Sequence, residues 1–363
     1  MNPITSETIR NALYKVKAPD SESDIVSLGL LSEIFIAHGK VFFSITVPDG
    51  RAQEWEFLRR TVEEAVCAID GVESAVVTLT AEKKTKLPSQ MHRNTAFSAS
   101  KRRIGLPVKM SIEGVRHVIA VASGKGGVGK STMAINIALA LQDAGFKTGV
   151  MDADIYGPSL PRLTGLINQK PQFIDGKKIQ PLEKFGLKLM SMGFLVEEEK
   201  PVVWRGPMVM AAVAQLLRDV LWNPLDVLVV DMPPGTGDAQ LTLAQQVQLT
   251  GALIVSTPQD LALVDARKAI EMFMKVDVAI LGFIENMSYF IAPDTGKRYD
   301  IFGYGGACAE AKRRGVPFLA EMPLDAALRL SSDDGVPIFV TQPDGEYAEL
   351  YRVIVEKIKN KFF

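Results

Sequence analysis

The chain has 363 residues, a length that suggests two domains or one large and one small domain, and its 47% hydrophobic content is enough for a buried core. Its formal net charge of −1 excludes a chain-wide attraction to nucleic acid or to an anionic membrane. The only cysteines, Cys67 and Cys308, exclude a disulfide framework. Few cysteines, no apolar leader and no apolar run of about 18 residues predict a cytoplasmic protein without a membrane span.

Residues 1–82 are predicted to form a small α+β domain. Apolar residues at helical spacing predict helices over Thr5–Val16 and Glu54–Ile69. Short runs rich in β-branched and aromatic residues predict three strands, and His38-Gly39 between the first two predicts a hairpin. The expected strands are Ile34–Ala37, Lys40–Val47 and Val72–Thr80.

Residues 83–115 have the composition of a basic flexible linker. No aspartate or glutamate occurs from Lys83 to Ile112, and the basic residues are interspersed with serine, asparagine and proline. A basic tract can also contact RNA, DNA or lipid, but a solvated tether is the interpretation that the composition favours.

In residues 116–363, short apolar runs alternate with helical segments. Continuous apolar strands that alternate with helices predict an α/β fold, with a mostly parallel sheet covered by helices on both faces. Ligands bind such sheets outside the carboxyl ends of the strands. The expected strands are Val118–Ala122, Lys147–Met151, Val227–Val230, Ala252–Ser256 and Ala279–Ile284, and the expected helices include Thr132–Ala144, Pro207–Leu221 and Leu263–Phe273.

A glycine-rich loop follows the first of these strands. Residues 124–131 read Gly-Lys-Gly-Gly-Val-Gly-Lys-Ser before a helical segment, and a strand, this loop and a helix together define the P-loop of an NTPase. The glycines let backbone N–H groups turn toward phosphate oxygens, while Lys130 would reach the β- and γ-phosphates and Ser131 would bind Mg²⁺. The expected ATP contacts are Gly124, Lys125, Gly126, Gly127, Val128, Gly129, Lys130, Ser131 and Thr132.

Acidic residues follow two further strands of this region. Asp231 comes directly after Val227–Val230, and Asp152 and Asp154 come after Lys147–Met151. A carboxylate at a strand end is suited to support Mg²⁺, and two carboxylates one residue apart can orient water near a γ-phosphate. Asp152 and Asp154 would also suit helix capping or a turn, but the strand-end position favours a functional role.

These motifs resemble those of the Mrp/ApbC iron–sulfur cluster carriers, within the MinD/ParA class of ATPases. The resemblance rests on the early P-loop lysine, Lys125, and on three stretches elsewhere in the chain. Residues 1–82 resemble, more weakly, the iron–sulfur assembly domain that precedes the ATPase in many bacterial members. The three stretches are Asp152–Ser159 (DADIYGPS), Asp231–Asp238 (DMPPGTGD) and Glu285–Ser288 (ENMS).

The resemblance implies a homodimeric, Mg²⁺-dependent ATPase that assembles iron–sulfur clusters or transfers them to apoproteins. Its implied partners are client and scaffold proteins, without stable binding to nucleic acid or membrane. Lys125 would reach across the dimer to the partner's phosphates, Asp154 would position the attacking water, and Asn286 would hydrogen-bond the adenine. The implied catalytic residues are Lys125, Lys130 and Asp154, and the implied Mg²⁺ residues are Ser131, Asp152 and Asp231.

The stretch after Glu285–Ser288 departs from the carrier pattern. Carriers of this type have Cys-x-x-Cys there, one pair per subunit, to bridge a 4Fe-4S cluster, and the corresponding residues are Ala292 and Thr295. Neither residue binds iron as a thiolate does. Three alternatives stay open: a cluster held by other ligands such as Cys308, a contribution from Cys67, or assistance to transfer without direct binding. For both cysteines we favour the interpretation of a small buried hydrophobic side chain.

A second class of function is a MinD/ParA-like positioning ATPase that acts on membrane or DNA. The C-terminal segment Tyr347–Phe363 has apolar residues at four-residue spacing and lysines near its end, a pattern that also suits a helix lying on anionic lipid. An ordinary terminal helix packed on the sheet has the same spacing, and it is the interpretation we favour.

Overall fold

The structure is a computed structural model of the chain, and most of the sequence is described in it. The predicted turn at residues 38–39, most of the predicted linker and the last three residues lie outside the described part. The described residues are 5–19, 21, 23–32, 34–37, 40–48, 52–72, 74–82, 109–174, 178–196 and 206–360.

In its described residues, the N-terminal unit has a three-stranded sheet and two helices, which confirms the predicted small α+β domain. Strand β1 (Phe35–Ala37) pairs antiparallel with β2 (Lys40–Pro48), and β2 pairs parallel with β3 (Ser74–Glu82). The helices α1 (Ser6–Leu13) and α2 (Ala52–Cys67) lie close to their predicted bounds. The core of this unit includes Ile9, Leu13, Ile25, Val41, Phe43, Ile45, Trp55, Val62 and Val66.

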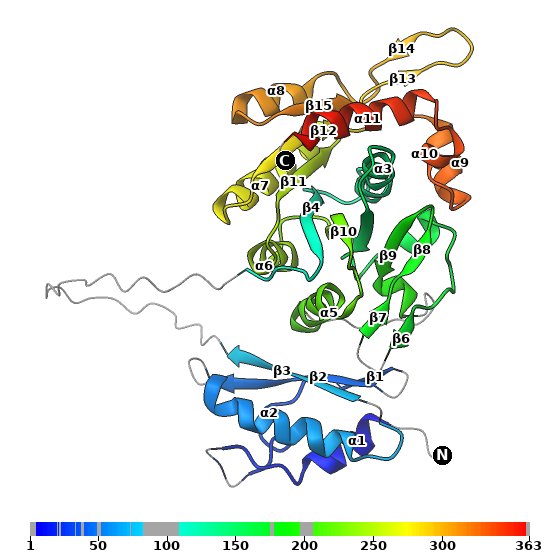
Figure 1. Cartoon of the computed structure of the whole chain (residues 1–363). Helices are drawn as coiled ribbons and strands as arrows, with labels where there is room; N and C mark the ends of the chain where they lie inside the picture. Colours follow the sequence, from blue (N-terminus) through cyan, green and yellow to red (C-terminus); the bar gives the residue numbers. More distant parts are fainter. Residues whose placement is uncertain are drawn as a thin grey trace, which may run out of the picture. The chain divides into compact units, whose positions relative to one another are not determined.

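The P-loop unit is described over residues 109–174, 178–196 and 212–360, and these residues contain an eight-stranded sheet in the order β15-β12-β11-β4-β10-β5-β9-β8 (Figure 1). Every neighbouring pair is parallel except β8 and β9, which confirms the predicted mostly parallel sheet. The strands are β4 (Val115–Ser123), β5 (Thr148–Asp152), β8 (Leu182–Lys184), β9 (Leu187–Ser191), β10 (Leu225–Asp231), β11 (Gly251–Ser256), β12 (Ile280–Glu285) and β15 (Phe318–Glu321).

Three strands of this sheet were not predicted, namely β8, β9 and β15. Lys188 interrupts the apolar residues of β9, and β8 and β15 have only three and four residues, so none of the three shows the continuous apolar run that marked the predicted strands. Two short two-stranded ribbons were also missed. They are β6 (Gln172–Ile174) with β7 (Lys178–Gln180), and β13 (Phe290–Ile291) with β14 (Arg298–Tyr299).

Helices lie on both sides of the large sheet (Figure 1). On one side α3 packs against the C-terminal helix α11, and on the other α7 packs against α8. The helices are α3 (Lys130–Asp143), α4 (Leu160–Leu163), α5 (Gly206–Asp219), α6 (Asp238–Gln246), α7 (Asp260–Lys275), α8 (Gly306–Arg314), α9 (Ala326–Asp333), α10 (Ile338–Thr341) and α11 (Glu346–Lys359), and a single 3₁₀ turn spans Met192–Phe194.

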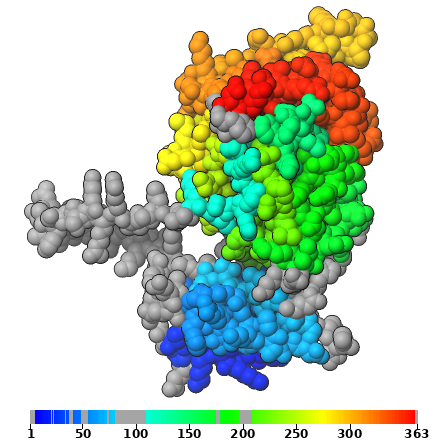
Figure 2. Space-filling view, viewed as in Figure 1, coloured from blue at the N-terminus to red at the C-terminus, as the bar shows by residue number. Residues whose placement is uncertain are grey.

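The C-terminal helix α11 buries its apolar side against the P-loop unit. Tyr351, Ile354 and Ile358 have no exposed surface, and α11 packs on α3 and β15. In Figure 2 its outer side (red) lies at the surface of the unit. The favoured interpretation of an ordinary packed helix is therefore confirmed. In the part of the chain that the structure describes, no helix has both the length and the apolar character needed to cross a membrane.

The described end of the predicted linker packs on the P-loop unit. Met110 donates its N–H to the Gln246 carbonyl at 2.6 Å, and Ile112 is buried. The ammonium of Lys109 donates to the Val276 carbonyl at 2.8 Å. Residues 109–114 therefore lead the chain into β4 along a defined path.

Two tyrosines of α11 provide a matched test of this packing. The Tyr347 hydroxyl donates to the Pro323 carbonyl at 2.8 Å, whereas the fully buried Tyr351 hydroxyl has no partner among the described residues. We expect Tyr347→Phe to lower the free energy of unfolding by about 1 kcal/mol, because it orphans a buried carbonyl. Tyr351→Phe should leave it unchanged or raise it, because an unsatisfied hydroxyl is removed. Urea unfolding of both variants checks this, and equal destabilisation would contradict it.

Candidate functional site

The P-loop connects β4 to α3 at the carboxyl edge of the sheet. Gly127 and Gly129 have φ of 79° and 85°, in the left-handed region that glycine adopts without strain. The Ser123 hydroxyl donates to the Lys125 carbonyl at 2.7 Å, and α3 begins at Lys130. The loop therefore has the predicted position between a buried strand and a helix N-terminus, where backbone N–H groups and the helix dipole favour phosphate.

Gly124 lies against the backbone of α7. A Cβ atom there would come within 2.2 Å of the carbonyl carbon of Asp265, whereas a Cβ atom at Gly126 would meet nothing within 4 Å. Backbone atoms cannot move aside as a side chain can, so only glycine fits at the first of these two positions.

Three predicted site residues meet in a buried cluster of charges. Asp231 and Asp152 end the adjacent strands β10 and β5 and are partners in the register of the sheet. The Lys130 ammonium forms an ion pair with Asp231 and donates to the Ser131 hydroxyl at 3.3 Å. Lys130, Asp152 and Asp231 are 7%, 1% and 2% exposed.

Burial raises the pKa of both carboxyl groups. It raises the pKa of Asp152 to about 7, and the nearby Asp231 charge adds to the rise. It also raises the pKa of Asp231, although the paired Lys130 ammonium offsets part of the increase. A cation placed between these carboxylates would favour their ionised forms.

Asp152 also organises the loop that follows β5. Its Oδ1 accepts from the N–H of Asp154 at 3.0 Å, and its Oδ2 accepts from the N–H groups of Ser159 and Leu160 at 2.9 and 3.1 Å. The Ser191 hydroxyl of β9 donates to the same Oδ2 at 3.1 Å. Asp152 therefore both organises a turn and stands at the end of a strand, as the sequence allowed. Asp154 itself is half-buried and accepts from the N–H of Gly157 at 3.2 Å.

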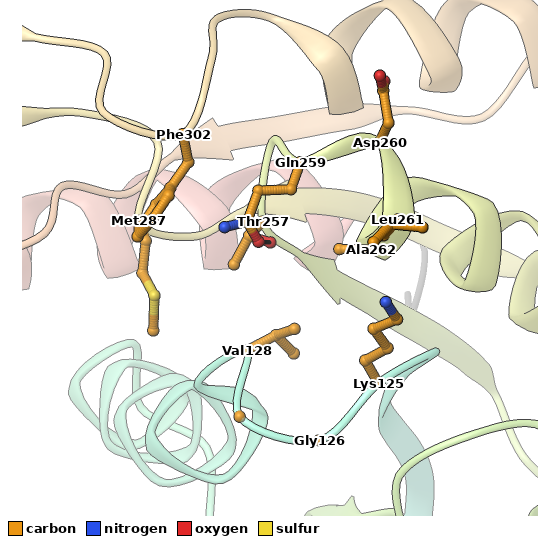
Figure 3. A pocket seen from close by; sticks show the side chains of 11 residues that line it. Lys125, Gly126, Val128, Thr257, Gln259, Asp260, Leu261, Ala262, Met287 and Phe302 are labelled. Atoms are coloured by element: carbon orange, nitrogen blue, oxygen red, sulfur yellow. Dashed lines mark hydrogen bonds between the residues drawn. The ribbon is translucent and has the colours of Figure 1, made fainter.

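A pocket of about 540 Å³ lies between the P-loop and the start of α7 (Figure 3). In Figure 3, Lys125 and Val128 extend from the P-loop toward α7, and Met287 and Phe302 close one side. The Lys125 ammonium lies 3.8 Å from Asp265 Oδ2, and its side chain is 39% exposed. The pocket is lined by Lys125, Gly126, Gly127, Val128, Thr257, Gln259, Asp260, Leu261, Ala262, Met287 and Phe302.

Asn286 lies directly beneath the P-loop and does not line this pocket. Its Nδ2 donates to the Val128 carbonyl at 2.8 Å, and the residue is 2% exposed. Its Oδ1 is buried and has no partner among the described residues. The amide donor therefore supports the loop, and only the acceptor is left for a ligand.

The hairpin β13–β14 occupies the place of the missing Cys-x-x-Cys. The Ala292 N–H donates to the Lys297 carbonyl at 2.9 Å, and the Gly296 N–H donates to the Ala292 carbonyl at 2.8 Å. The Thr295 hydroxyl accepts from the Lys297 N–H at 3.4 Å. The turn is therefore closed by its own hydrogen bonds, and neither position carries a group that binds iron.

Both cysteines are exposed free thiols, so the interpretation that they are buried hydrophobic side chains was wrong. Cys67 is the last residue of α2 and Cys308 is in the first turn of α8. Burial was expected because free cysteine is often buried, but both side chains lie on the outer sides of their helices. Among the described residues, no group of three or more His, Cys, Asp or Glu is placed to hold a metal ion.

Several site residues were missed because no motif marks them. Asp265 lies far along the chain from its partner Lys125, and Ser191 lies in a strand that was not predicted. Thr257, Gln259 and Phe302 line the pocket from two loops without a distinctive spacing. Only Thr257 and Gln259 could have been suspected, because they follow a predicted strand at its carboxyl end.

A parallel sheet that leads through this loop into α3, with Asp231 at the end of the neighbouring strand, defines a nucleotide-binding P-loop NTPase. Residues 114–359 match the family profile described as NUBPL iron-transfer P-loop NTPase, and residues 6–79 match that of an iron–sulfur cluster assembly protein. The chain belongs to this family of ATP-binding iron–sulfur cluster carriers, with an N-terminal assembly domain.

Similar proteins span the whole chain or the P-loop unit. The chain is 41% identical to an iron–sulfur cluster carrier protein of Synechocystis over 99% of this chain and 98% of that protein. It is 51% identical to the iron–sulfur cluster transfer protein NUBPL of Dictyostelium discoideum, over 69% of this chain and 78% of that protein.

Among solved structures, a nucleotide-binding protein of Archaeoglobus fulgidus in complex with ADP is 38% identical, with a TM-score of 0.57 over 66% of this chain and 93% of that one. The cell division ATPase MinD of Pyrococcus furiosus is 24% identical, with a TM-score of 0.51 over 68% of this chain and 99% of that one, and it shares the fold.

The two glycines of the P-loop allow a matched test of the loop's packing on α7. We expect Gly124→Ala to destabilise the protein by about 1–3 kcal/mol, because the new Cβ atom would overlap the Asp265 backbone. Gly126→Ala, where the space is open, should unfold close to the wild-type midpoint. Denaturant unfolding without nucleotide is the measurement, so that effects on phosphate binding do not enter. A Gly124→Ala protein as stable as the wild type would refute the close packing.

Proposed function

We propose that this chain is a homodimeric, Mg²⁺-dependent ATPase that carries iron–sulfur clusters to apoproteins and works with scaffold proteins. The observation that carries the ATPase part is the buried cluster of Lys130, Asp152 and Asp231 beside an open P-loop. The cargo is inferred from the family to which the chain belongs. Two exposed free thiols suit a reducing compartment, and we infer the cytoplasm.

The charged cluster suggests how ATP would be received. Without ligand, Lys130 is paired with Asp231, and an incoming triphosphate would draw its ammonium toward the β- and γ-phosphates. Asp231 would then lose its cation, while Ser131 and Asp152 lie in the same cluster. This set fits Mg²⁺, which binds one or two carboxylates together with substrate phosphates and water. Mg²⁺ bound there would neutralise charge that develops on the transferred phosphoryl group.

Hydrolysis needs a positioned water and a further cation. Asp154 follows the buried Asp152 by two residues, and its Oδ1 accepts a hydrogen bond from the Gly157 N–H. We therefore assign Asp154 the role of positioning the attacking water. Lys125 is held toward Asp265 on α7 and is partly exposed, as expected of a cation that acts on the nucleotide of a second subunit. Such a cation stabilises the transition state in the way that an arginine finger does.

Asn286 is proposed to contact the adenine through its oxygen alone. Its Nδ2 is engaged with Val128, and its buried Oδ1 lacks a partner among the described residues. A buried acceptor without a donor is costly, and the adenine amino group is a donor that would satisfy it.

The iron–sulfur cluster is the proposed cargo, and its ligands would differ from those of carriers with Cys-x-x-Cys. Ala292 and Thr295 offer no thiolate, whereas Cys308 is an exposed thiol in the first turn of α8. One Cys308 from each subunit would provide two of the four thiolates that a cluster usually has. A cluster held by two protein thiolates is incompletely ligated, which suits transfer to a receiving protein.

Replacing Lys125 tests the dimeric mechanism. We expect Lys125→Ala to retain ATP binding and to lower the rate of hydrolysis by about 10³-fold, by analogy with loss of an arginine finger. Lys268→Ala is the matched control, because Lys268 also pairs with Asp265 but does not line the pocket beside the P-loop. Turnover and nucleotide affinity are measured for both variants across protein concentrations. Wild-type turnover per subunit that does not rise with concentration would argue against action in the dimer.

Anaerobic reconstitution with iron and sulfide tests the cargo. We expect bound iron and visible absorption in the wild type and in Cys67→Ala, and their loss in Cys308→Ala, because only Cys308 is proposed as a ligand. Bound iron and the absorption spectrum are the readouts. Absence of a cluster in all three proteins would rule out direct carriage and leave an ATPase that assists transfer.

A further inference from the structure

Glu285 is a buried acid with no role in the proposed phosphate chemistry. It ends β12 and has no exposed surface. Its Oε1 accepts from the Ser288 hydroxyl and its Oε2 accepts from the N–H of Ala307, both at 2.6 Å. Burial of a carboxylate is unfavourable unless hydrogen bonds replace its hydration. These two short bonds therefore offset the cost of burying Glu285.

The bond to Ala307 ties Glu285 to the start of α8. Ala307 is the second residue of this helix, where N–H groups have no partner within the helix. The N-cap residue is Gly305, which has no side chain to accept from them. Glu285 therefore acts as the cap from a distant strand, and its charge is favourable at the positive end of the helix dipole.

The next residue ties the same strand end to the P-loop. Asn286 Nδ2 donates to the Val128 carbonyl, and a Cβ atom built on Gly129 would come within 2.2 Å of that nitrogen. The amide is thus packed directly on the loop, and a movement of Val128 or Gly129 must displace it. Two consecutive residues, Glu285 and Asn286, therefore connect the P-loop with α8.

We propose that Glu285 is a positioning residue that couples nucleotide occupancy of the P-loop to the orientation of the first turn of α8, and so to the exposed thiol of Cys308. The proposal rests on the proposed function only in requiring that the P-loop binds nucleotide. Phosphate binding reorients the peptide groups of the loop, including the Val128 carbonyl that Asn286 holds. The strand end moves with Asn286, and the carboxylate transmits that shift to the Ala307 N–H. The device links the nucleotide state to the accessibility of a thiol on another element.

The reactivity of Cys308 measures this coupling. Cys67→Ser leaves Cys308 as the only cysteine of the full-length chain. The rate of its alkylation by N-ethylmaleimide is measured without iron, with and without Mg-ADP, and the affinity for a fluorescent ADP analogue is measured on the same samples. We expect Mg-ADP to change the rate by about fivefold or more, the lower end of usual couplings between sites. Glu285→Gln, which loses the charge, should bind the analogue but lose the change in rate.

Ser288→Ala is the matched control for loss of one hydrogen bond to the same carboxylate. It keeps the bond to Ala307 and should keep the response to Mg-ADP. If the Gln variant does not fold, Glu285→Asp replaces it. That variant keeps the charge but is one methylene too short to hold both donors, and it should show a weakened response. The coupling would be overturned if bound Mg-ADP left the alkylation rate of Cys308 unchanged in the wild type. It would also be overturned if the Glu285 variants showed the full change in rate. Failure of the wild type to bind the analogue would instead contradict the proposed ATPase function.

Discussion

The buried pairing of Lys130 with Asp231, beside Asp152, is the constraint around which the rest of the site is arranged. Two carboxylates on adjacent parallel strands face the same edge of the sheet, where mutual repulsion and burial both oppose their ionised forms. The Lys130 ammonium compensates Asp231, and a set of N–H and hydroxyl donors compensates Asp152. A site assembled in this way has two acidic groups and one cation, which suits a divalent cation brought in with nucleotide.

The sequence predicted the parts of this site that are continuous in the chain. The P-loop and the strand ends at Asp152 and Asp231 depend on local patterns, so their proximity followed from the rule that parallel strands share a carboxyl edge. Asp265 and Glu285 could not be assigned their roles, because each acts through a contact with a remote helix or loop. The five strands marked by apolar runs were found, whereas Lys188 interrupts the apolar residues of β9, and β8 and β15 have only three and four residues.

The exposure of the cysteines shows that the local sequence of a helix does not always predict which of its sides faces solvent. Cys308 follows two glycines and an alanine, a sequence that says little about which side of the helix faces outward. That side is determined by the cap from Glu285 and by the close approach of Gly306 to the Pro258 carbonyl, which a Cβ atom would meet at 2.9 Å. Both contacts come from neighbouring strand ends, and neither is visible in the local sequence.

The hairpin β13–β14 has a consequence for how the protein responds to its surroundings. Its turn is closed by backbone bonds at Ala292 and Gly296, so that its shape needs no metal. In small domains built around metal, ligand binding and folding are one equilibrium, and the fold is lost when the metal is removed. Here the bonds that close the hairpin come from the chain itself, so closure of this turn and binding of a metal are two separate equilibria.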